Sequence, residues 1–340
     1  MFKVKLVTSK NSDLLFRQTK GGLGISHCGK YKFYIDEPIE DPDFLVVRNK
    51  YIKHDSSWFV APENTMLFVS EPLSVVKFPK KYCNQFGLYY TCQENAEHKN
   101  IVFGGAALPW FIGGVDADGD HAITYDKLKS SNAPHKTKLI SVITSNKAFT
   151  QGHQDRIEFV AKLKAHYGDL LDVYGRGFND FEDKWDVLAP YKYHISIENS
   201  SYNYYWTEKI SDCYLAGTFP IYFGCKNISD YFPEDGFRAI NIYKFEEAVG
   251  IIDAILESDV YGKSLSALER CKNLVLDDYN LFNIISKCCD KLDSHAKKSQ
   301  IIFHPSQTLF DWHNFKLYFF QRNFYVVKGF LRKCFGKNHL

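Results

Sequence analysis

The sequence predicts an α/β protein, with a mostly parallel sheet in its first half and a doubly wound α/β domain in its second half. Three observations predict this class. Short β-rich runs alternate with helical segments, a polar segment separates two such successions, and a length of 340 residues suits two domains. With 45% hydrophobic and 24% charged residues, the chain has enough apolar material for folded cores, so disorder is not expected.

The first half contains a series of β-rich runs with one helical segment among them. The runs span residues 2–7, 30–35, 43–47, 65–70 and 86–92. Residues 73–86 have helical spacing until Pro79 interrupts it. Residues 113–137 are polar and rich in Gly, Asp and Ser, which predicts a linker.

The second half alternates strands and helices more regularly. Strands are expected at 138–145, 170–175, 193–199, 219–224 and 238–242, and helices at 154–168, 206–217 and 244–258. This succession is typical of a doubly wound sheet, in which ligands bind at the carboxyl ends of the strands.

Composition excludes several classes of protein. A net charge of +2 is too small to predict nucleic-acid binding. Nine cysteines without CxxC spacing, and no evident leader, predict reduced thiols in a cytoplasmic protein. For the adjacent Cys288 and Cys289, buried helix thiols are favoured over a redox or metal site. No run of about 20 apolar residues predicts a membrane span.

The densest hydrogen-bonding stretch is IENSSYNYYWTEK, residues 197–209. Its start finishes a predicted strand and its end opens the next helix, so both ends should meet at one edge of the sheet. Thr207 is expected to cap that helix, and Lys209 adds positive charge to a helix start that already favours anions. These features suit a diphosphate, while Glu208 suits sugar hydroxyls or a developing positive charge. An ordinary capped turn with an exposed charge pair is the alternative.

Residues 198–224, ENSSYNYYWTEKISDCYLAGTFPIYFG, resemble the signature of family 10 glycosyltransferases, the α-1,3/1,4-fucosyltransferases. Upstream, SVITSNKAFTQGHQDRIEF at 141–159 and DVYGRG at 172–177 are similar to further family segments. In the first half the resemblance is thinner and depends on MLFVSEPLSV at 66–75 and ALPWFIGG at 107–114.

The resemblance implies a GT-B architecture of two Rossmann-like domains facing a cleft. Residues 1–130 would form the acceptor domain and 138–310 the domain that binds the nucleotide sugar. Residues 311–340 would form a basic amphipathic tail or crossover helix.

The resemblance also implies roles for individual residues. Arg156 and Lys209 would hold the diphosphate, Asn199 and Tyr205 would hydrogen-bond the phosphates, and Glu208 would bind donor hydroxyls and stabilise an oxocarbenium ion.

Three further residues follow from the other matched segments. Asn146 and Arg176 join the implied donor-binding set. Glu71 matches the family's proposed general base, and its position after a predicted strand independently places a carboxylate at a strand's carboxyl end. A surface loop glutamate is the alternative for Glu71.

The sequence departs from the family pattern at Ile197, Tyr204 and Trp206. Trp206 is expected to change the packing beside the nucleotide, and Tyr204 is expected to influence which sugar fits.

The implied function is inverting transfer of fucose from GDP-fucose to a glycan acceptor. A bacterial surface polysaccharide containing N-acetylglucosamine, with an α-1,3 or α-1,4 linkage, is the expected product class. No metal is expected, because DADGD at 116–120 is interpreted as a turn rather than as a metal-binding motif. The alternatives are transfer from another nucleotide sugar and a non-catalytic glycan-binding protein of the same fold. An oxidoreductase is disfavoured, because no GxGxxG follows a predicted strand.

From residue 312 to the end the chain has no Asp or Glu, while Lys and Arg alternate with aromatic and aliphatic residues. Such a segment is typical of peripheral contact with an anionic membrane, and residues 318–340 would make it at the inner face. A helix that crosses back onto the first domain is the equal alternative.

Overall fold

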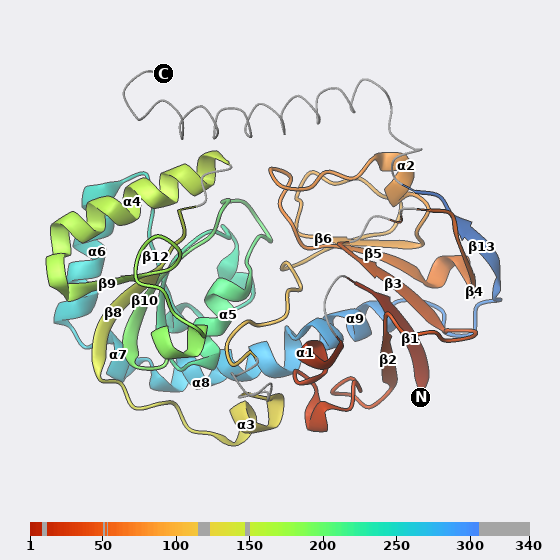
Figure 1. The fold of residues 1–340 in the computed structure, drawn as a ribbon, viewed down its shortest axis with the longest axis horizontal. Helices are drawn as coiled ribbons and strands as arrows, with labels where there is room; N and C mark the ends of the chain where they lie inside the picture. Colours follow the sequence, from red (N-terminus) through yellow and green to blue (C-terminus); the bar gives the residue numbers. More distant parts are fainter. Residues whose placement is uncertain (9–11, 50–51, 53, 115–122, 147–149, 306–340) are drawn as a thin grey trace.

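The computed structural model consists of two α/β halves that lie side by side, each built on a parallel sheet (Figure 1). The structure describes residues 1–305 except 9–11, 50–51, 53, 115–122 and 147–149. The predicted α/β class with two doubly wound domains is confirmed.

The first sheet has six parallel strands in the order β2-β1-β3-β5-β6-β7. They are β1 (Phe2–Val7), β2 (Tyr31–Ile35), β3 (Phe44–Arg48), β5 (Thr65–Val69), β6 (Leu88–Thr91) and β7 (Ile101–Phe103). β3 and β5 are buried along their whole length. Burial on both faces explains why they read as unbroken apolar runs rather than as alternating patterns.

The second sheet has five parallel strands in the order β12-β11-β10-β8-β9. They are β8 (Lys138–Ile143), β9 (Leu171–Tyr174), β10 (Tyr191–Ile197), β11 (Phe219–Phe223) and β12 (Arg238–Ala239). In both sheets the first strand lies between the second and the third. The strand order therefore reverses between β8 and β10, and ligands bind beside that switch point in folds of this kind.

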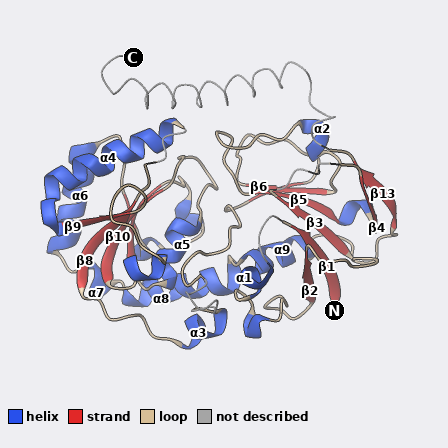
Figure 2. Cartoon of the chain, viewed as in Figure 1, coloured by secondary structure: helices blue, strands red, loops and turns tan. Residues whose placement is uncertain are grey.

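The second sheet is covered by helices on both faces. Figure 2 shows α4 (Gln151–Tyr167) and α6 (Phe245–Glu257) to one side, and α5 (Glu208–Leu215) and α8 (Leu265–Asn273) to the other. Phe159, Val160 and Leu163 of α4 are buried, whereas Lys164 is exposed. Shorter helices are α1 (Ser12–Phe16), α2 (Lys80–Cys83), α3 (Tyr125–Ser130) and α7 (Val260–Lys263).

The chain returns to the first half through α9 (Leu281–Cys289), which follows a π-helical turn at Leu274–Asp278. Leu281, Phe282 and Ile285 of α9 are fully buried in the core cluster that also contains the inner residues of β1, β2 and β3. The crossover thus lies at α9, inside the range 138–310 expected for the second domain. Residues 311–340 lie outside the described residues.

A small antiparallel ribbon also ties the end of the described chain to the first half. β13 (Ser299–Phe303) pairs with β4 (Ser56–Val60), which the sequence did not predict. β4 is short and alternates between exposed and half-buried residues until Val60, so its apolar pattern is weak.

The helix α2 is shorter than predicted, whereas the two adjacent cysteines lie as predicted. The helix expected over 73–86 is reduced to α2, since Pro79 stands directly before its first residue. Cys288 and Cys289 are buried in α9 as reduced thiols, as expected. None of the helices in the described part of the chain has the length and apolar character needed to cross a membrane.

Candidate functional site

A pocket of about 550 Å³ opens at the carboxyl edge of the second sheet, beside the switch point. Thr144 and Ser145 after β8, Gly175 after β9, and Asn199 after β10 line it. Its charged lining consists of Arg156, Arg176, Asp180, Lys184, Glu208, Lys209 and Asp212. Four cations at the carboxyl ends of parallel strands favour an anionic ligand.

Arg156 enters the pocket from the first turns of α4. Its side chain is buried, and Nη1 donates a hydrogen bond to Oδ1 of Asn199 at 2.5 Å. Gly152 allows this approach, because a Cβ there would lie 2.0 Å from the Asn199 carbonyl oxygen. Burial lowers the pKa of Arg156, while Glu198 opposes that effect. Arg156 and Asn199, which the resemblance assigns to the same ligand group, thus contact each other at this edge of the sheet.

The turn into α5 gathers charges around Lys209. Thr207 is the N-cap residue, as expected, and its Oγ1 accepts the Lys209 N–H at 3.4 Å. The fully buried Glu198 accepts hydrogen bonds from Thr207 N at 2.8 Å and from Thr207 Oγ1. Lys209 Nζ then lies 3.1 Å from Glu198 and 3.5 Å from Glu208. Glu208 and Lys209 are therefore not an exposed charge pair.

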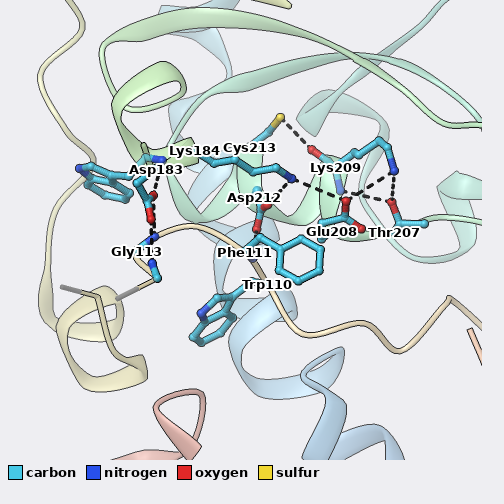
Figure 3. Close-up of polar contacts among 12 residues, drawn as sticks. Trp110, Phe111, Gly113, Asp183, Lys184, Thr207, Glu208, Lys209, Asp212 and Cys213 are labelled. Atoms are coloured by element: carbon cyan, nitrogen blue, oxygen red, sulfur yellow. Dashed lines mark hydrogen bonds and ion pairs between the residues drawn. The ribbon is translucent and has the colours of Figure 1, made fainter. Parts of the chain in front are cut away.

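A second lysine continues this chain of charges, as Figure 3 shows. Lys184 Nζ lies 3.6 Å from Glu208 and 2.9 Å from Asp212. Asp212 is fully buried in α5 and accepts the Phe111 N–H at 3.0 Å. Next to Lys184, Asp183 accepts the Gly113 N–H at 2.8 Å. These hydrogen bonds hold residues 111–113, which leave the first half, against the charged wall of the pocket. We use that name for Lys184, Glu198, Glu208, Lys209 and Asp212.

The carboxylates of this wall differ in protonation equilibrium. Burial raises the pKa of Glu198 and of Asp212. Burial alone would also raise the pKa of Glu208, but Lys209 and Lys184 lower it to about 2. The two ammonium groups therefore keep Glu208 ionised at neutral pH in spite of its burial.

Several polar atoms of the pocket lining are buried without a partner among the described residues. They are Thr144 Oγ1, Ser196 Oγ and Arg156 Nε. Buried polar groups are normally hydrogen-bonded. Their lack of protein partners suits a pocket that binds a ligand rich in hydrogen-bonding oxygens.

Glu71 comes from the other half of the molecule, two residues after β5. It is half-buried, and burial raises its pKa, as does the negative charge of Glu208. Lys209 and Arg48 act in the opposite direction. Glu71 therefore lies within electrostatic reach of the charged wall of the second half.

Three contacts bring the loop 200–206 against the first half. Ser200 Oγ lies 3.4 Å from Ser74 Oγ, and Asn203 N donates to Glu94 at 3.1 Å. The carbonyl oxygen of Trp206 accepts the Ala106 N–H at 3.0 Å. These contacts place the loop 200–206 next to the strand end that carries Glu71.

The other predicted site residues are placed differently. Arg176 lines the pocket, whereas Asn146 is exposed and does not. Tyr205 is buried, and its ring centroid lies 5.2 Å from that of Tyr202. Burial and the negative charge of Glu198 raise the pKa of Tyr205. Neither Asn146 nor Tyr205 belongs to the pocket lining.

The expectation for Trp206 is corrected. Its ring packs edge-on against Tyr231, Phe232 and Tyr279, at centroid distances of 5.3 to 5.4 Å, and covers Gly105 of the first half. Trp206 thus fills the junction between the halves rather than the pocket. The stretch 116–120 lies outside the described residues.

Sequence reasoning missed Lys184, Asp212 and His194. Asp212 stands within the segment that resembles the family signature, but nothing there signals its pairing with Lys184. His194 is buried on β10 beneath the pocket, where its Nδ1 lies 2.8 Å from Ser141 Oγ. Among the described residues, no group of three His, Cys, Asp or Glu side chains is arranged to hold a metal ion.

Comparison with known proteins adds a family. Residues 133–303 match the model of glycosyltransferase family 10 (fucosyltransferase), C-terminal part. The 4-galactosyl-N-acetylglucosaminide 3-alpha-L-fucosyltransferase 9 of Homo sapiens is 27% identical over 137 residues, which are 37% of this chain and 37% of that protein. The alpha-(1,3)-fucosyltransferase FucT of Helicobacter pylori is 35% identical over 77 residues, 22% of this chain and 16% of that protein.

The matched region thus spans well under half of the length of these curated relatives. Among solved structures, an α1,3-fucosyltransferase with GDP aligns over 83% of this chain and 92% of its own, with 15% identity and a TM-score of 0.48.

Proposed function

Because the chain belongs to glycosyltransferase family 10, the fucosyltransferases, we propose that it transfers fucose from GDP-fucose to a hydroxyl group of a glycan acceptor. One observation carries the proposal. Arg156 and Lys209 line the same pocket at the carboxyl edge of a parallel sheet, although they come from different helices. Two cations in that position suit the diphosphate of a nucleotide sugar.

On the donor side, Arg156, Lys209 and Arg176 neutralise the negative charge that develops on the departing GDP. Preorganised cations stabilise a leaving group more strongly in a partly buried site than in water. Glu208, held ionised, accepts hydrogen bonds from donor hydroxyls and stabilises positive charge on the sugar ring. Asn199, which already orients Arg156, provides an amide beside the phosphates.

On the acceptor side, Glu71 is the general base. It removes the proton of the attacking hydroxyl while that oxygen bonds to C1 of fucose and GDP leaves from the opposite face. One displacement inverts the configuration at C1 and requires no covalent intermediate. A pKa raised by burial brings Glu71 closer to the pH at which a base is most effective.

The acceptor is proposed to be a glycan containing N-acetylglucosamine, fucosylated through an α-1,3 or α-1,4 linkage. The names of the human and bacterial relatives support the α-1,3 linkage, and the human name supports the N-acetylglucosamine-containing acceptor. A bacterial surface polysaccharide, reached by a cytoplasmic enzyme with peripheral membrane contact through residues 318–340, remains the proposed setting. Asn146 and Tyr205 are kept as proposed donor contacts.

A nucleotide panel tests the donor. Calorimetric titration with GDP, UDP and CMP should give the tightest binding with GDP, and equal or tighter binding of UDP would favour a different nucleotide sugar. GDP release from GDP-fucose in the presence of N-acetyllactosamine then tests transfer, with and without EDTA. Unchanged turnover in EDTA is expected, and binding of acceptor without any turnover would identify a non-catalytic glycan-binding protein.

The base assignment needs a matched pair of variants. Glu71→Ala should lower turnover at least about a hundredfold, the contribution typical of a general base, with nearly unchanged GDP affinity. Glu97→Ala is the control, because Glu97 is an exposed glutamate of the same half, paired with Lys80. If Glu71→Ala weakens GDP binding and spares turnover, the assignment is wrong.

A further inference from the structure

Lys184 is a cation that neither the family resemblance nor the matched segments assign to the reaction. It follows β9 on the 3₁₀ turn Lys184–Val187, and its side chain is only 19% exposed. Its ammonium lies between two carboxylates, 2.9 Å from Asp212 and 3.6 Å from Glu208 (Figure 3). It also stands over the ring of Phe111, 5.4 Å from the centroid.

Asp212 is a rigid anchor for this ammonium. Its side chain has no exposed surface, and its Oδ1 is already occupied by the Phe111 N–H. Its other oxygen, Oδ2, accepts a hydrogen bond from Lys184 Nζ at 2.9 Å. Lys184 is therefore held by Asp212 in a fixed place, from which it reaches Glu208.

One oxygen of Glu208, Oε1, consequently contacts two ammonium groups at nearly equal distances, 3.5 Å for Lys209 and 3.6 Å for Lys184. Lys209 alone would not fix its direction, since Lys209 is closer to Glu198, at 3.1 Å. The second ammonium contacts the same oxygen, Glu208 Oε1, and opposes displacement of that oxygen toward Lys209.

Lys184 is poorly suited to bind phosphate itself. Its strongest contact is the buried Asp212, and a ring covers another side of the ammonium. Arg156 and Arg176 line the same pocket, and no ion pair involving either is found among the described residues. The diphosphate therefore has better-placed cations available.

We propose that Lys184 is a positioning residue for sugar transfer: anchored by Asp212, it aims the Glu208 carboxylate at the sugar half of the donor. The inference rests on the proposed function and deepens it. It predicts that Lys184 acts on the fucose-dependent part of binding and catalysis, whereas GDP alone does not depend on it.

The test compares GDP with GDP-fucose in the full chain. Lys184→Met should lower turnover of GDP-fucose about tenfold or more, the effect expected when one charge-assisted contact is lost in the transition state, while the Kd for GDP changes less than about twofold. Lys184→Arg should recover most of the turnover, because it keeps the charge. Equal losses for GDP and GDP-fucose would show that Lys184 binds the diphosphate and would overturn the proposal, as would wild-type turnover in Lys184→Met.

A second variant guards against misfolding, since Lys184→Met leaves the buried Asp212 without its counter-ion. Lys184→Met/Asp212→Asn removes both charges together and should fold while showing the same selective loss of fucose-dependent turnover. Lys162→Met, at an exposed lysine of α4, is the control. If the wild-type chain binds neither GDP nor GDP-fucose, the proposed function fails; if it turns over GDP-fucose and the double variant equals it, only the role of Lys184 fails.

Discussion

Lys209 pairs with buried carboxylates and also lines the proposed ligand pocket, so Lys209→Met should lower both the stability of the fold and the affinity for GDP. The ammonium lies 3.1 Å from the fully buried Glu198 and 3.5 Å from Glu208. Removing one partner of a buried ion pair typically costs about 3 to 5 kcal/mol, because the other charge is left without compensation. Glu198 keeps two hydrogen bonds from Thr207, and Glu208 keeps Lys184, so the lower end, about 3 kcal/mol, is expected.

The loss should depend on pH in a defined direction. Burial raises the pKa of Glu198, and the Lys209 ammonium offsets part of that rise. Without Lys209, the pKa of Glu198 should therefore rise further. A carboxyl with a raised folded-state pKa destabilises the fold when ionised, and protonation relieves that cost as pH falls. The stability deficit of Lys209→Met should therefore be larger at pH 8 than at pH 5.

Guanidinium unfolding, followed by circular dichroism at both pH values, measures this deficit. Lys209→Met/Glu198→Gln should recover part of it, because it removes the uncompensated charge. In calorimetry, the GDP affinity of Lys209→Met should fall about 10-fold to 100-fold, as expected for one charge-assisted phosphate contact. A deficit below about 1 kcal/mol that is equal at both pH values would refute the reasoning about burial.

Three further predictions follow from single positions. Gly152→Ala would ordinarily favour a helix, but the new Cβ meets the Asn199 carbonyl at 2.0 Å, so GDP affinity and melting temperature should both fall; a higher melting temperature would contradict this. Arg48→Met removes a buried cation that lowers the pKa of Glu71, so the acidic limb of the pH–rate profile should shift to higher pH. An unshifted limb would show that Arg48 does not act on the group that titrates there. Burial lowers the pKa of His194 to about 3, so the folded state keeps it neutral while the unfolded chain takes up a proton below about pH 6.5, and stability falls as pH falls from there. In His194→Asn the unfolding midpoint should therefore depend less on pH between about 6.5 and 4. An unchanged pH dependence would argue against that burial effect.

The unit formed by β10, the following loop and α5 could be predicted from the sequence because its signals are local. A buried strand ends at Ile197, Thr207 caps the next helix, and Lys209 follows within the first turn. The topology of parallel strands then places both ends at one edge. Local chemistry and topology were sufficient here.

The remainder of the site depends on contacts between segments far apart in the sequence. Lys184 lies in a polar connection and meets Asp212 only when α5 packs beside it, which spacing does not reveal. Asn146 was expected in the pocket, but its turn is fixed by a backbone hydrogen bond to the Arg176 carbonyl at 3.1 Å, and its side chain stays exposed. The apolar face of α9 could pack against either sheet. The predicted second domain, 138–310, therefore included α9, although the helix packs in the first half.

The proposal that Arg156 and Lys209 together bind a diphosphate is tested most directly by calorimetric titration of GDP into the wild-type chain and into Arg156→Met/Lys209→Met. Binding to the wild type, reduced at least about a hundredfold in the double variant and unchanged in Lys162→Met, is the predicted result. Equal GDP affinity in all three proteins would contradict it.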